Sequence, residues 1–442
     1  MGARDRFHRR PVPGGARRAV AGDDGVAGVV SSRVTTAVPT KERVWAKGKV
    51  IHIHALERHT DLRALNFFCD WLLRNPNAKE IIFVFEDGFR IFPNAMAPLA
   101  ALLCFLESVG INAKIHNNHA SIAECAVFEP VQSIPCEQRS DPSNLVWEYR
   151  DSNELEFLID LVVSNLYRKV SSQKNTLLAL EYCLSEIMDN VLRHSKDQAG
   201  FFMYTLQRDN QRISISVADQ GIGIHRSFAN TVYHPVSASD AITLAMRKGV
   251  TSSPDGAGNG LWTTTEIITK NTGQLTITSG SGAIYYNKSI EKTNSYDDIP
   301  TIDPRWPGTN LDFQLDFHSD VDFKSLWGDL PSPVNTRTER LENSEDEVVL
   351  RIKEQSFGTS TRESGKEIRV LAANLLRTQE RDVLLDFSDV TMVSSSYADE
   401  LVAKILADHS IAGVSTRLHV FGANSTVNLI ISDAVRSRKK LR

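Results

Sequence analysis

The clearest pattern of apolar and polar positions lies between Leu177 and Ser195, LLALEYCLSEIMDNVLRHS. Glu186, Asn190 and His194 recur there at four-residue spacing and form a polar stripe. A carboxylate one turn before an amide suits a metal-phosphate site, since an Asn oxygen can ligate Mg²⁺ and a carboxylate can activate a hydroxyl. A merely solvated helix face is the plainer interpretation. Apolar side chains recur beside the stripe at helical spacing and predict one amphipathic helix: Leu177, Leu180, Leu184, Ile187 and Val191.

A second pattern is strand-like alternation that stops at glycines. The stretch Ile213 to Ile224, ISISVADQGIGI, alternates and then breaks at Asp219, Gly221 and Gly223. A carboxylate at the end of a strand can accept a hydrogen bond from an exocyclic amine. The glycines let backbone approach a flat base or a phosphate. A glycine-rich hairpin turn is the alternative interpretation.

A third pattern is a glycine loop directly before a helix. In KGVTSSPDGAGNGL, residues 248–261, three glycines alternate, and an apolar-periodic run follows from Trp262 to Ile268. Backbone N–H groups and a helix N-terminus together favour an anion. An ordinary surface loop is the alternative, and Arg247 and Lys248 before it are expected to be solvated charges. The glycines are Gly256, Gly258 and Gly260.

The order of these signals is more specific than any one of them. Glu-x-x-x-Asn, then Asp-x-Gly-x-Gly, then Gly-x-Gly-x-Gly-Leu resembles the ATP-binding domain shared by DNA gyrase, the heat-shock chaperone of that superfamily, histidine kinases and MutL, the GHKL superfamily. Gly308 and Thr309, in PGTNLDFQLDF, look like the last box of that family. The resemblance covers about residues 155–317. It implies a Bergerat-type α/β sandwich, a mixed sheet with helices on one face.

The resemblance also implies ATP and Mg²⁺ as cofactors and a role for each site residue. Glu186 would be the general base or its positioner, Asn190 would hold Mg²⁺, and Asp219 would bind the adenine amine. No Gly-x-x-x-x-Gly-Lys-Ser/Thr motif is present, so the site is not a P-loop. The other site residues would be Gly221 and Gly223 at the base, Gly256, Gly258, Gly260 and Leu261 in a lid over the phosphates, and Thr309 near the adenine.

A small α/β unit precedes this domain, at residues 43–146. Its apolar runs predict strands at 50–54, 80–85 and 113–116 and helices at 61–74 and 94–109, which implies an open sheet with helices packed on it. The sequence from Glu80 to Ile115 resembles a divergent STAS domain, the fold of anti-sigma-factor antagonists. Residues 1–42 lack periodicity and are predicted to be a disordered tail or the product of a wrongly chosen start codon, with a transit peptide as the alternative.

A second α/β unit is predicted at residues 348–442, after a polar linker at 321–347. The stretch DVLLDFSDVTMVSSSYADELVAKIL resembles STAS domains more closely, in particular a STAS-like domain of unknown function found beside such ATPases. By position, Ser395 corresponds to the phosphoacceptor of that family, although Ser394 replaces an Asp and Tyr397 a Gly. The alternative is that Ser395 only caps the following helix.

Composition narrows the class of protein. The chain has 442 residues, room for about three domains. A formal net charge of -4 argues against a nucleic-acid binder. Five scattered cysteines without a Cys-x-x-Cys pair indicate a reducing compartment, so a cytoplasmic protein is expected. No apolar run reaches the ~20 residues of a membrane span.

Together these patterns predict a multidomain α/β protein that responds to a nucleotide. Residues 147–320 would bind ATP with Mg²⁺ and act on the two STAS-like domains, by ATP hydrolysis or by serine-kinase activity toward Ser395. A non-catalytic, nucleotide-sensing scaffold is the alternative. Family analogy suggests a regulatory protein partner in anti-sigma-factor signal transduction, and a homodimer. A two-component histidine kinase is disfavoured, because no acceptor His precedes the ATP domain on a long helix.

Overall fold

The computed structural model describes residues 43–57, 59–74, 79–116, 120–133, 141–173, 175–194, 199–207, 211–252, 259–287, 292–297, 308–322, 326, 341, 347–356, 358–378 and 381–440. The expected tail at 1–42 and most of the expected linker lie outside these residues. So do Gly256 and Gly258 of the expected lid.

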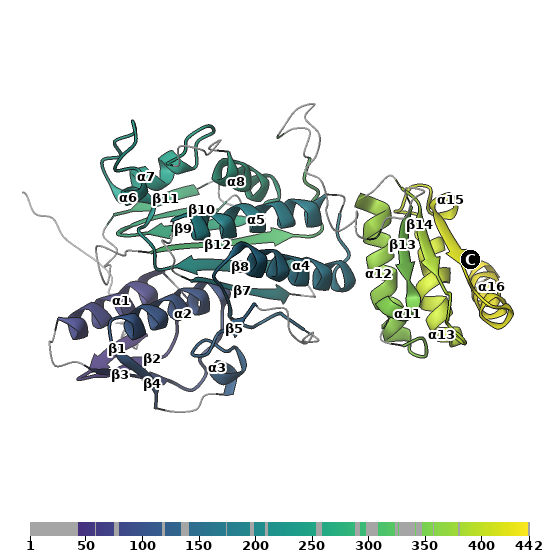
Figure 1. The fold of residues 1–442 in the computed structure, drawn as a ribbon, viewed down its shortest axis with the longest axis horizontal. Coiled ribbons are helices and arrows are strands. Elements are labelled where there is room, and N and C mark those ends of the chain that lie inside the picture. Colours follow the sequence, from purple (N-terminus) through teal and green to yellow (C-terminus); the bar gives the residue numbers. More distant parts are fainter. Residues whose placement is uncertain are drawn as a thin grey trace, which may run out of the picture. The chain divides into compact units, whose positions relative to one another are not determined.

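An eight-stranded mixed sheet forms the centre, in the order β11-β10-β9-β12-β8-β7-β6-β5 (Figure 1). Neighbouring strands are antiparallel except for β5 and β6. In the register of β12 and β8, Thr309 lies opposite Asp219, which brings two of the predicted site residues together. The strands are β5 (Val131–Gln132), β6 (Trp147–Tyr149), β7 (Gly200–Gln207), β8 (Arg212–Asp219), β9 (Gln274–Ser279), β10 (Gly282–Asn287), β11 (Lys292–Tyr296) and β12 (Thr309–Asp316).

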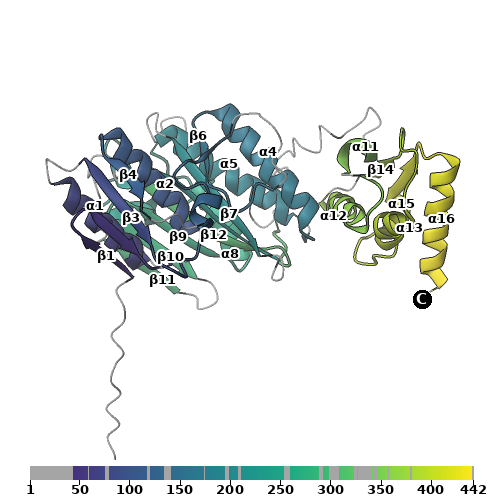
Figure 2. The ribbon, with the colours of Figure 1, turned by 90° about the horizontal axis from the view of Figure 1, so that it is seen from below.

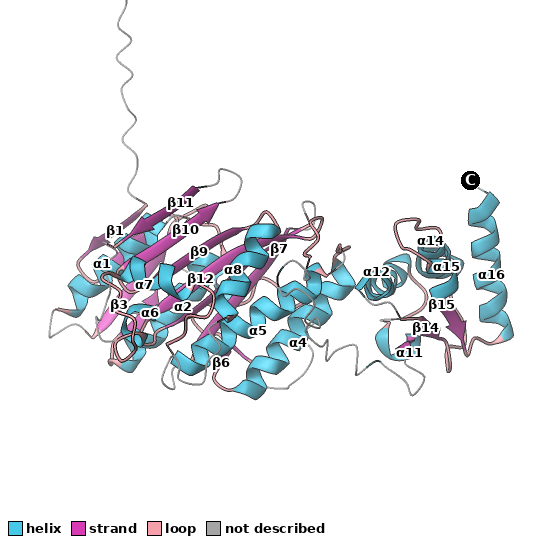
Figure 3. Cartoon of the chain, turned by 90° about the horizontal axis from the view of Figure 1, so that it is seen from above, coloured by secondary structure: helices cyan, strands magenta, loops and turns pink. Residues whose placement is uncertain are grey.

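Three helices cover one face of this sheet: α4 (Ser152–Lys169), α5 (Thr176–His194) and α8 (Gly260–Lys270) (Figure 3). Phe202 and Tyr204 of β7 join the core on this face, because alternate side chains of a strand point to opposite faces. The apolar seam predicted for α5 is buried along its whole length, which confirms that helix: Leu177, Leu180, Leu184, Ile187 and Val191.

The N-terminal unit covers the other face. Its four-stranded sheet has the order β1-β2-β3-β4, and α2 (Pro93–Ser108) packs on β7 and β8 (Figure 2). Phe201 and Met203 therefore belong to the core of this unit, which explains why β7 is apolar on both faces. The antiparallel edge strand β1 was not predicted. The remaining elements are β1 (Val44–Lys47), β2 (Val50–Ile53), α1 (His59–Leu73), β3 (Glu80–Phe85), β4 (Asn112–Ile115) and α3 (Ala120–Glu124).

Some elements of the central domain gave no clear sequence signal. Strand β11 lies in the polar stretch 288–307, whose composition predicts a polar insertion, so that prediction is wrong for these five residues. The helices α6 (Ile224–Ser227) and α7 (Ala238–Ala245) lie between the second and third motifs. Asp297, which follows β11, accepts hydrogen bonds from the backbone N–H of Ser239 at 2.7 Å and from its hydroxyl at 2.7 Å. This carboxylate therefore fastens α7 to the edge of the sheet.

The C-terminal domain has a parallel three-stranded sheet, β13-β14-β15. The helix expected after the serine cluster runs from 395 to 406, and its middle is a π-helical turn, η2 (Asp399–Ala403). The elements of the C-terminal domain are β13 (Val348–Arg351), α11 (Ile352–Gln355), α12 (Arg362–Thr378), β14 (Val383–Asp386), α13 (Ser395–Ala398), η2, α14 (Lys404–Leu406), α15 (Val414–Arg417), β15 (Leu418–Phe421) and α16 (Ser425–Lys440).

A buried amide joins this domain to the central one. Asn374 of α12 is fully buried, and its Nδ2 donates to the carbonyls of Tyr167 at 3.0 Å and Val170 at 2.8 Å. Its Oδ1 accepts from the backbone N–H of Ser172 at 3.1 Å. Arg168 adds two bonds to Gln355, at 2.5 and 2.6 Å. We call the contacts of Asn374 and Arg168 the α4–α12 joint.

Candidate nucleotide site

A cavity of about 550 Å³ lies between α5, α8 and the ends of β8 and β12. The three motifs, which are far apart in the sequence, meet around it. Gly221 does not line the cavity, but its N–H donates to Asp219 at 2.6 Å. Because Gly256 and Gly258 are not among the described residues, their role in a lid stays a prediction. The predicted residues that line the cavity are Glu186, Asn190, Asp219, Gly223, Gly260, Leu261 and Thr309.

Helix α5 supplies the charged wall. Glu186, Asn190 and His194 all line the cavity, as their four-residue spacing predicted. Burial raises the pKa of Glu186, and a hydrogen bond from the Tyr182 hydroxyl opposes that rise. A carboxylate with a raised pKa is a stronger base than a solvated one, which suits proton transfer from a hydroxyl or a water. Tyr182, one turn before Glu186, also lines the cavity.

Gly260 is required by its close approach to this carboxylate. A Cβ at Gly260 would lie 2.0 Å from Oε2 of Glu186, far inside van der Waals contact. The first residue of α8 therefore sits directly against the wall of α5. Any larger residue there would displace the carboxylate or the start of α8.

The opposite end of the cavity is a set of fixed hydrogen-bonding groups. Asp219 accepts from the N–H groups of Gly221 and Thr309, and burial raises the pKa of its carboxyl to about 7. Gly308 has a φ of +69°, and a Cβ there would lie 2.5 Å from the Asp219 carbonyl, so only glycine fits. The hydroxyl of Ser279 lies 3.0 Å from that of Thr309.

Apolar walls complete this end of the cavity, and walls of this kind suit a flat, largely apolar ring. The three motifs do not include Tyr182, although its position one helical turn before Glu186 places it on the same polar stripe. No motif could identify Ser279, because only strand pairing brings Ser279 to the site. The apolar lining residues are Ile187, Val191, Val217, Ile224, Phe228, Ile277 and Leu311.

Few cations of the described residues lie at the cavity. Arg193 lines the cavity but forms an ion pair with Asp189 at 2.6 Å. Lys248 is exposed to solvent, as expected, and its ammonium also lies 4.6 Å from the centre of the Trp262 ring on α8. The described part of the chain contains no group of three or more His, Cys, Asp or Glu placed to hold a metal. A single amide such as Asn190 still fits Mg²⁺, because that ion commonly takes one or two protein ligands and completes its shell with phosphates and water.

Ser395 lies in the C-terminal domain and does not cap its helix. The cap is Ser394, whose hydroxyl accepts from the N–H of Tyr397 at 3.0 Å. Ser395 is exposed, and no side-chain hydrogen bond of Ser395 occurs within the described residues. The capping alternative for Ser395 is therefore wrong.

Two parts of the chain match known families. Residues 175–292 match the family described as histidine kinase-, DNA gyrase B-, and HSP90-like ATPase. Residues 364–428 match a STAS-like domain of unknown function. The chain thus carries a GHKL-type ATPase domain followed by a STAS-like domain. The STAS resemblance of residues 43–146 has no such match and stays a prediction.

Two solved structures resemble the chain weakly. The 43K ATPase domain of Thermus thermophilus gyrase B, in complex with an aminocoumarin, is 17% identical over 37% of this chain and 38% of that one, with a TM-score of 0.21. The topoisomerase IV ATP-binding domain of Francisella tularensis, in complex with a small-molecule inhibitor, is 18% identical over 44% of this chain and 86% of that one, with a TM-score of 0.22. TM-scores this low add nothing to the assignment. No curated protein matches the sequence.

Among the described residues, no helix is both long and apolar enough to cross a membrane.

Proposed function

We propose that this protein is a Mg²⁺-dependent, ATP-binding regulatory protein whose central domain acts on its STAS-like domain. The observation that carries the proposal is the meeting of Glu186, Asn190 and Asp219 in one cavity of about 550 Å³. A base, a hard metal ligand and an amine acceptor are the three groups that a Mg–ATP site needs. The family of residues 175–292 supports the same conclusion.

The nucleotide would lie with its adenine between the apolar walls and its amine against Asp219. Thr309 and Ser279 would hold the adjoining edge of the base. Asn190 would hold Mg²⁺, which neutralises the charge of the phosphates when it is bound. The N-terminal turn of α8, beginning at Gly260, would take the phosphates with its free N–H groups.

The reaction we propose is phosphoryl transfer to Ser395. Glu186 takes the proton of the serine hydroxyl, and the serine oxygen forms a bond to the γ-phosphorus. The bond from that phosphorus to the bridging oxygen breaks, and ADP leaves with the electron pair. Two observations favour Ser395: its hydroxyl is exposed, and Ser394 has already taken the capping role.

Hydrolysis is the second candidate, and the position of Glu186 favours it. The carboxylate is only partly buried and lines an open cavity, so a water can take the place of the serine hydroxyl. Closure of the predicted lid at Gly256, Gly258 and Gly260 would then carry the nucleotide state to the STAS-like domain.

The setting we propose is signal transduction of the anti-sigma-factor type, in the cytoplasm, with a regulatory protein partner or a second copy of the chain. The free thiols among the described residues, of which Cys69, Cys125 and Cys183 are buried, support a reducing compartment. An acceptor serine on an exposed surface is open to the ATP site of another copy.

The test is incubation of the purified chain with γ-labelled ATP and Mg²⁺, following both labelled protein and free phosphate. Wild type stands beside Glu186→Gln, Ser395→Ala and the control Ser396→Ala. Label lost in the first two variants and kept in the control is the expected result. Free phosphate that depends on Glu186, with no labelled protein at all, would refute the kinase and leave an ATPase. ATP binding without either product would leave a nucleotide-sensing scaffold.

A further inference from the structure

A second cavity lies in the STAS-like domain, where α13 and η2 face α16. Its volume is about 560 Å³. Ser395 and Asp399 line it from one side, and Asp433, Arg436 and Arg438 line it from α16. Ser395 and Asp399 are four residues apart on one continuous helix, so their side chains lie on the same face.

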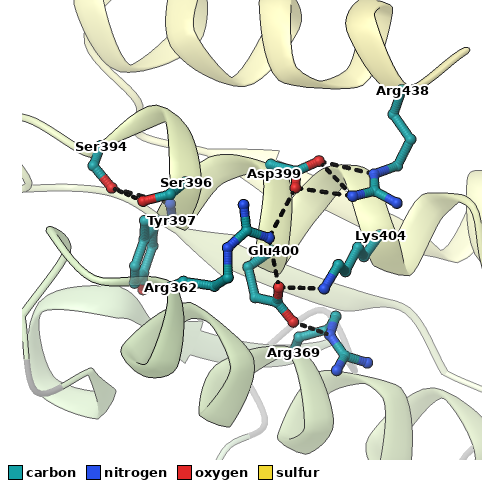
Figure 4. Close-up of polar contacts among 9 residues, drawn as sticks. All are labelled: Arg362, Arg369, Ser394, Ser396, Tyr397, Asp399, Glu400, Lys404 and Arg438. Carbon is teal, nitrogen blue, oxygen red and sulfur yellow. Dashed lines mark hydrogen bonds and ion pairs between the residues drawn. The ribbon is translucent and has the colours of Figure 1, made fainter. Parts of the chain in front are cut away.

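Asp399 is the first carboxylate of a charged cluster beside this cavity (Figure 4). Arg438 donates to Asp399 through Nε at 2.8 Å and through Nη2 at 2.9 Å, a two-pronged contact. Arg362 donates to the same carboxylate at 3.1 Å. Two guanidinium groups therefore share one carboxylate at the wall of the cavity.

Glu400 is the second carboxylate, and it is only 2% exposed. It accepts from Arg362 at 3.0 Å and Arg369 at 3.3 Å, and it forms an ion pair with Lys404. The π-helical turn at Asp399–Ala403 carries both carboxylates. Such turns are rare, and they occur often at functional sites.

The charges of this cluster do not balance. Two carboxylates, Asp399 and Glu400, are surrounded by four cations, which leaves an excess of two positive charges at a partly buried position. Asp433 and Arg436, which line the cavity from α16, carry opposite charges and leave this excess unchanged. Like charges repel one another, so this excess of positive charge at the wall of the cavity attracts a further anion. The four cations are Arg362, Arg369, Lys404 and Arg438.

We propose that this cluster binds the phosphate of phosphoserine 395. The Arg438 guanidinium would exchange its contact with Asp399 for one with the phosphate. The inference rests on Ser395 being the acceptor in the proposed function. A phosphoserine carries about −1.5 to −2 charges at pH 7, which matches the excess of the cluster. A planar guanidinium that already makes a two-pronged contact with a carboxylate can make the same contact with a phosphate. Arg362 stays between Asp399 and Glu400 and holds both in place.

The experiment installs phosphoserine at position 395 of the full chain during translation, so that no ATP and no activity of Glu186 is needed. Thermal unfolding is compared with and without the phosphate in wild type, Arg438→Gln and Lys439→Gln. Lys439 is exposed on the same helix and does not line the cavity. Its variant therefore controls for the loss of one positive charge from α16. We expect the phosphate to raise the melting temperature by about 2–6 °C in wild type and in Lys439→Gln, and not in Arg438→Gln.

A second measurement needs no arginine variant. Phosphorus NMR of the wild-type phosphoprotein gives the second pKa of the phosphate, which is about 6 when the group is free. Contact with Arg438 should lower it. A free value of this pKa, or an equal melting shift in Arg438→Gln, would overturn the inference.

A titration with inorganic phosphate distinguishes the two sources of this anion. Protection of the unmodified chain by free phosphate that requires Arg438, without any effect of phosphoserine 395, would also refute our assignment. None of these outcomes bears on whether the central domain binds ATP, because the phosphate is installed independently.

Discussion

Replacing Asp219 by Asn tests two separate effects of this carboxylate: the stability that its burial costs the fold, and its proposed recognition of the adenine amine. Burial raises the pKa of Asp219 from 3.8 to about 7. A difference of about 3 pH units corresponds to roughly 4 kcal/mol that opposes the ionised form above pH 7. The amide in Asp219→Asn has no such cost and keeps an oxygen for the Gly221 N–H. The pKa of about 7 already includes the hydrogen bonds from Gly221 and Thr309, so we expect a net stabilisation of about 3–4 kcal/mol above pH 7, or about 6–12 °C in melting temperature.

The sign of the pH dependence follows from the direction of the pKa change. Because folding raises the pKa, the folded chain holds this proton between about pH 4 and pH 7 and the unfolded chain does not. Wild type therefore loses stability as the pH rises through that window, and Asp219→Asn does not. The advantage of the variant should be absent near pH 4 and complete above pH 7, as measured by calorimetry at several pH values.

The same substitution should damage nucleotide binding, because the introduced amide turns an N–H group toward the adenine amine. We expect ATP affinity to fall by about 10- to 100-fold, measured by isothermal titration calorimetry at pH 8. Asp312→Asn is the matched control: burial raises the pKa of Asp312 to about 7 as well, and Asp312 does not line the cavity. It should gain stability and keep its ATP affinity. A pH-independent loss of stability in Asp219→Asn, or unchanged ATP affinity, would refute the reasoning.

Three further substitutions test other parts of the structure. Gly260→Ala should reduce phosphoryl transfer or phosphate release more than tenfold with a smaller change in ATP affinity, because its methyl group would push the Glu186 carboxylate aside; equal losses in both assays would contradict this. Ser394→Ala should cost about 1 kcal/mol in chemical denaturation and Ser395→Ala almost nothing, since Ser394 is the cap; the reverse order would restore the capping role of Ser395. Asn374→Ala leaves buried polar groups unpaired, so it should cost about 2–4 kcal/mol and split thermal unfolding into two transitions; a single unshifted transition would show that the α4–α12 joint contributes nothing.

The sequence predicted the parts of the fold that have strong local periodicity. The core helix at Thr176–His194 and strand β3 were found almost to the residue, since both have dense apolar patterns. Strand β11 was missed because its residues, KTNSY, lie at a sheet edge and carry no apolar alternation. The π-helical turn at Asp399–Ala403 could not be predicted from the sequence either, because its residues still follow the apolar pattern of an α-helix.

The three motifs converge on one cavity, whereas strand pairing adds a residue that no motif contains. The motifs named Glu186, Asn190 and Asp219, and all three meet in one cavity. Ser279 reaches Thr309 only because β9 and β12 pair in one particular register. Among three consecutive serines, the choice of the cap depended on backbone angles that the sequence alone does not give.

The α4–α12 joint lies within one chain, so the ratio of the two domains is fixed and their contact does not depend on protein concentration. One chain carries one ATPase-type domain and one STAS-like domain, and Asn374 holds them in contact in addition to the covalent connection. Contacts within a chain do not weaken on dilution, unlike those between separate proteins. Neither a change in expression level nor dilution on cell growth can alter the ratio of the two domains. Under the proposed function, the nucleotide supply and the phosphorylation of Ser395 are the two variables that would set the state of this pair of domains.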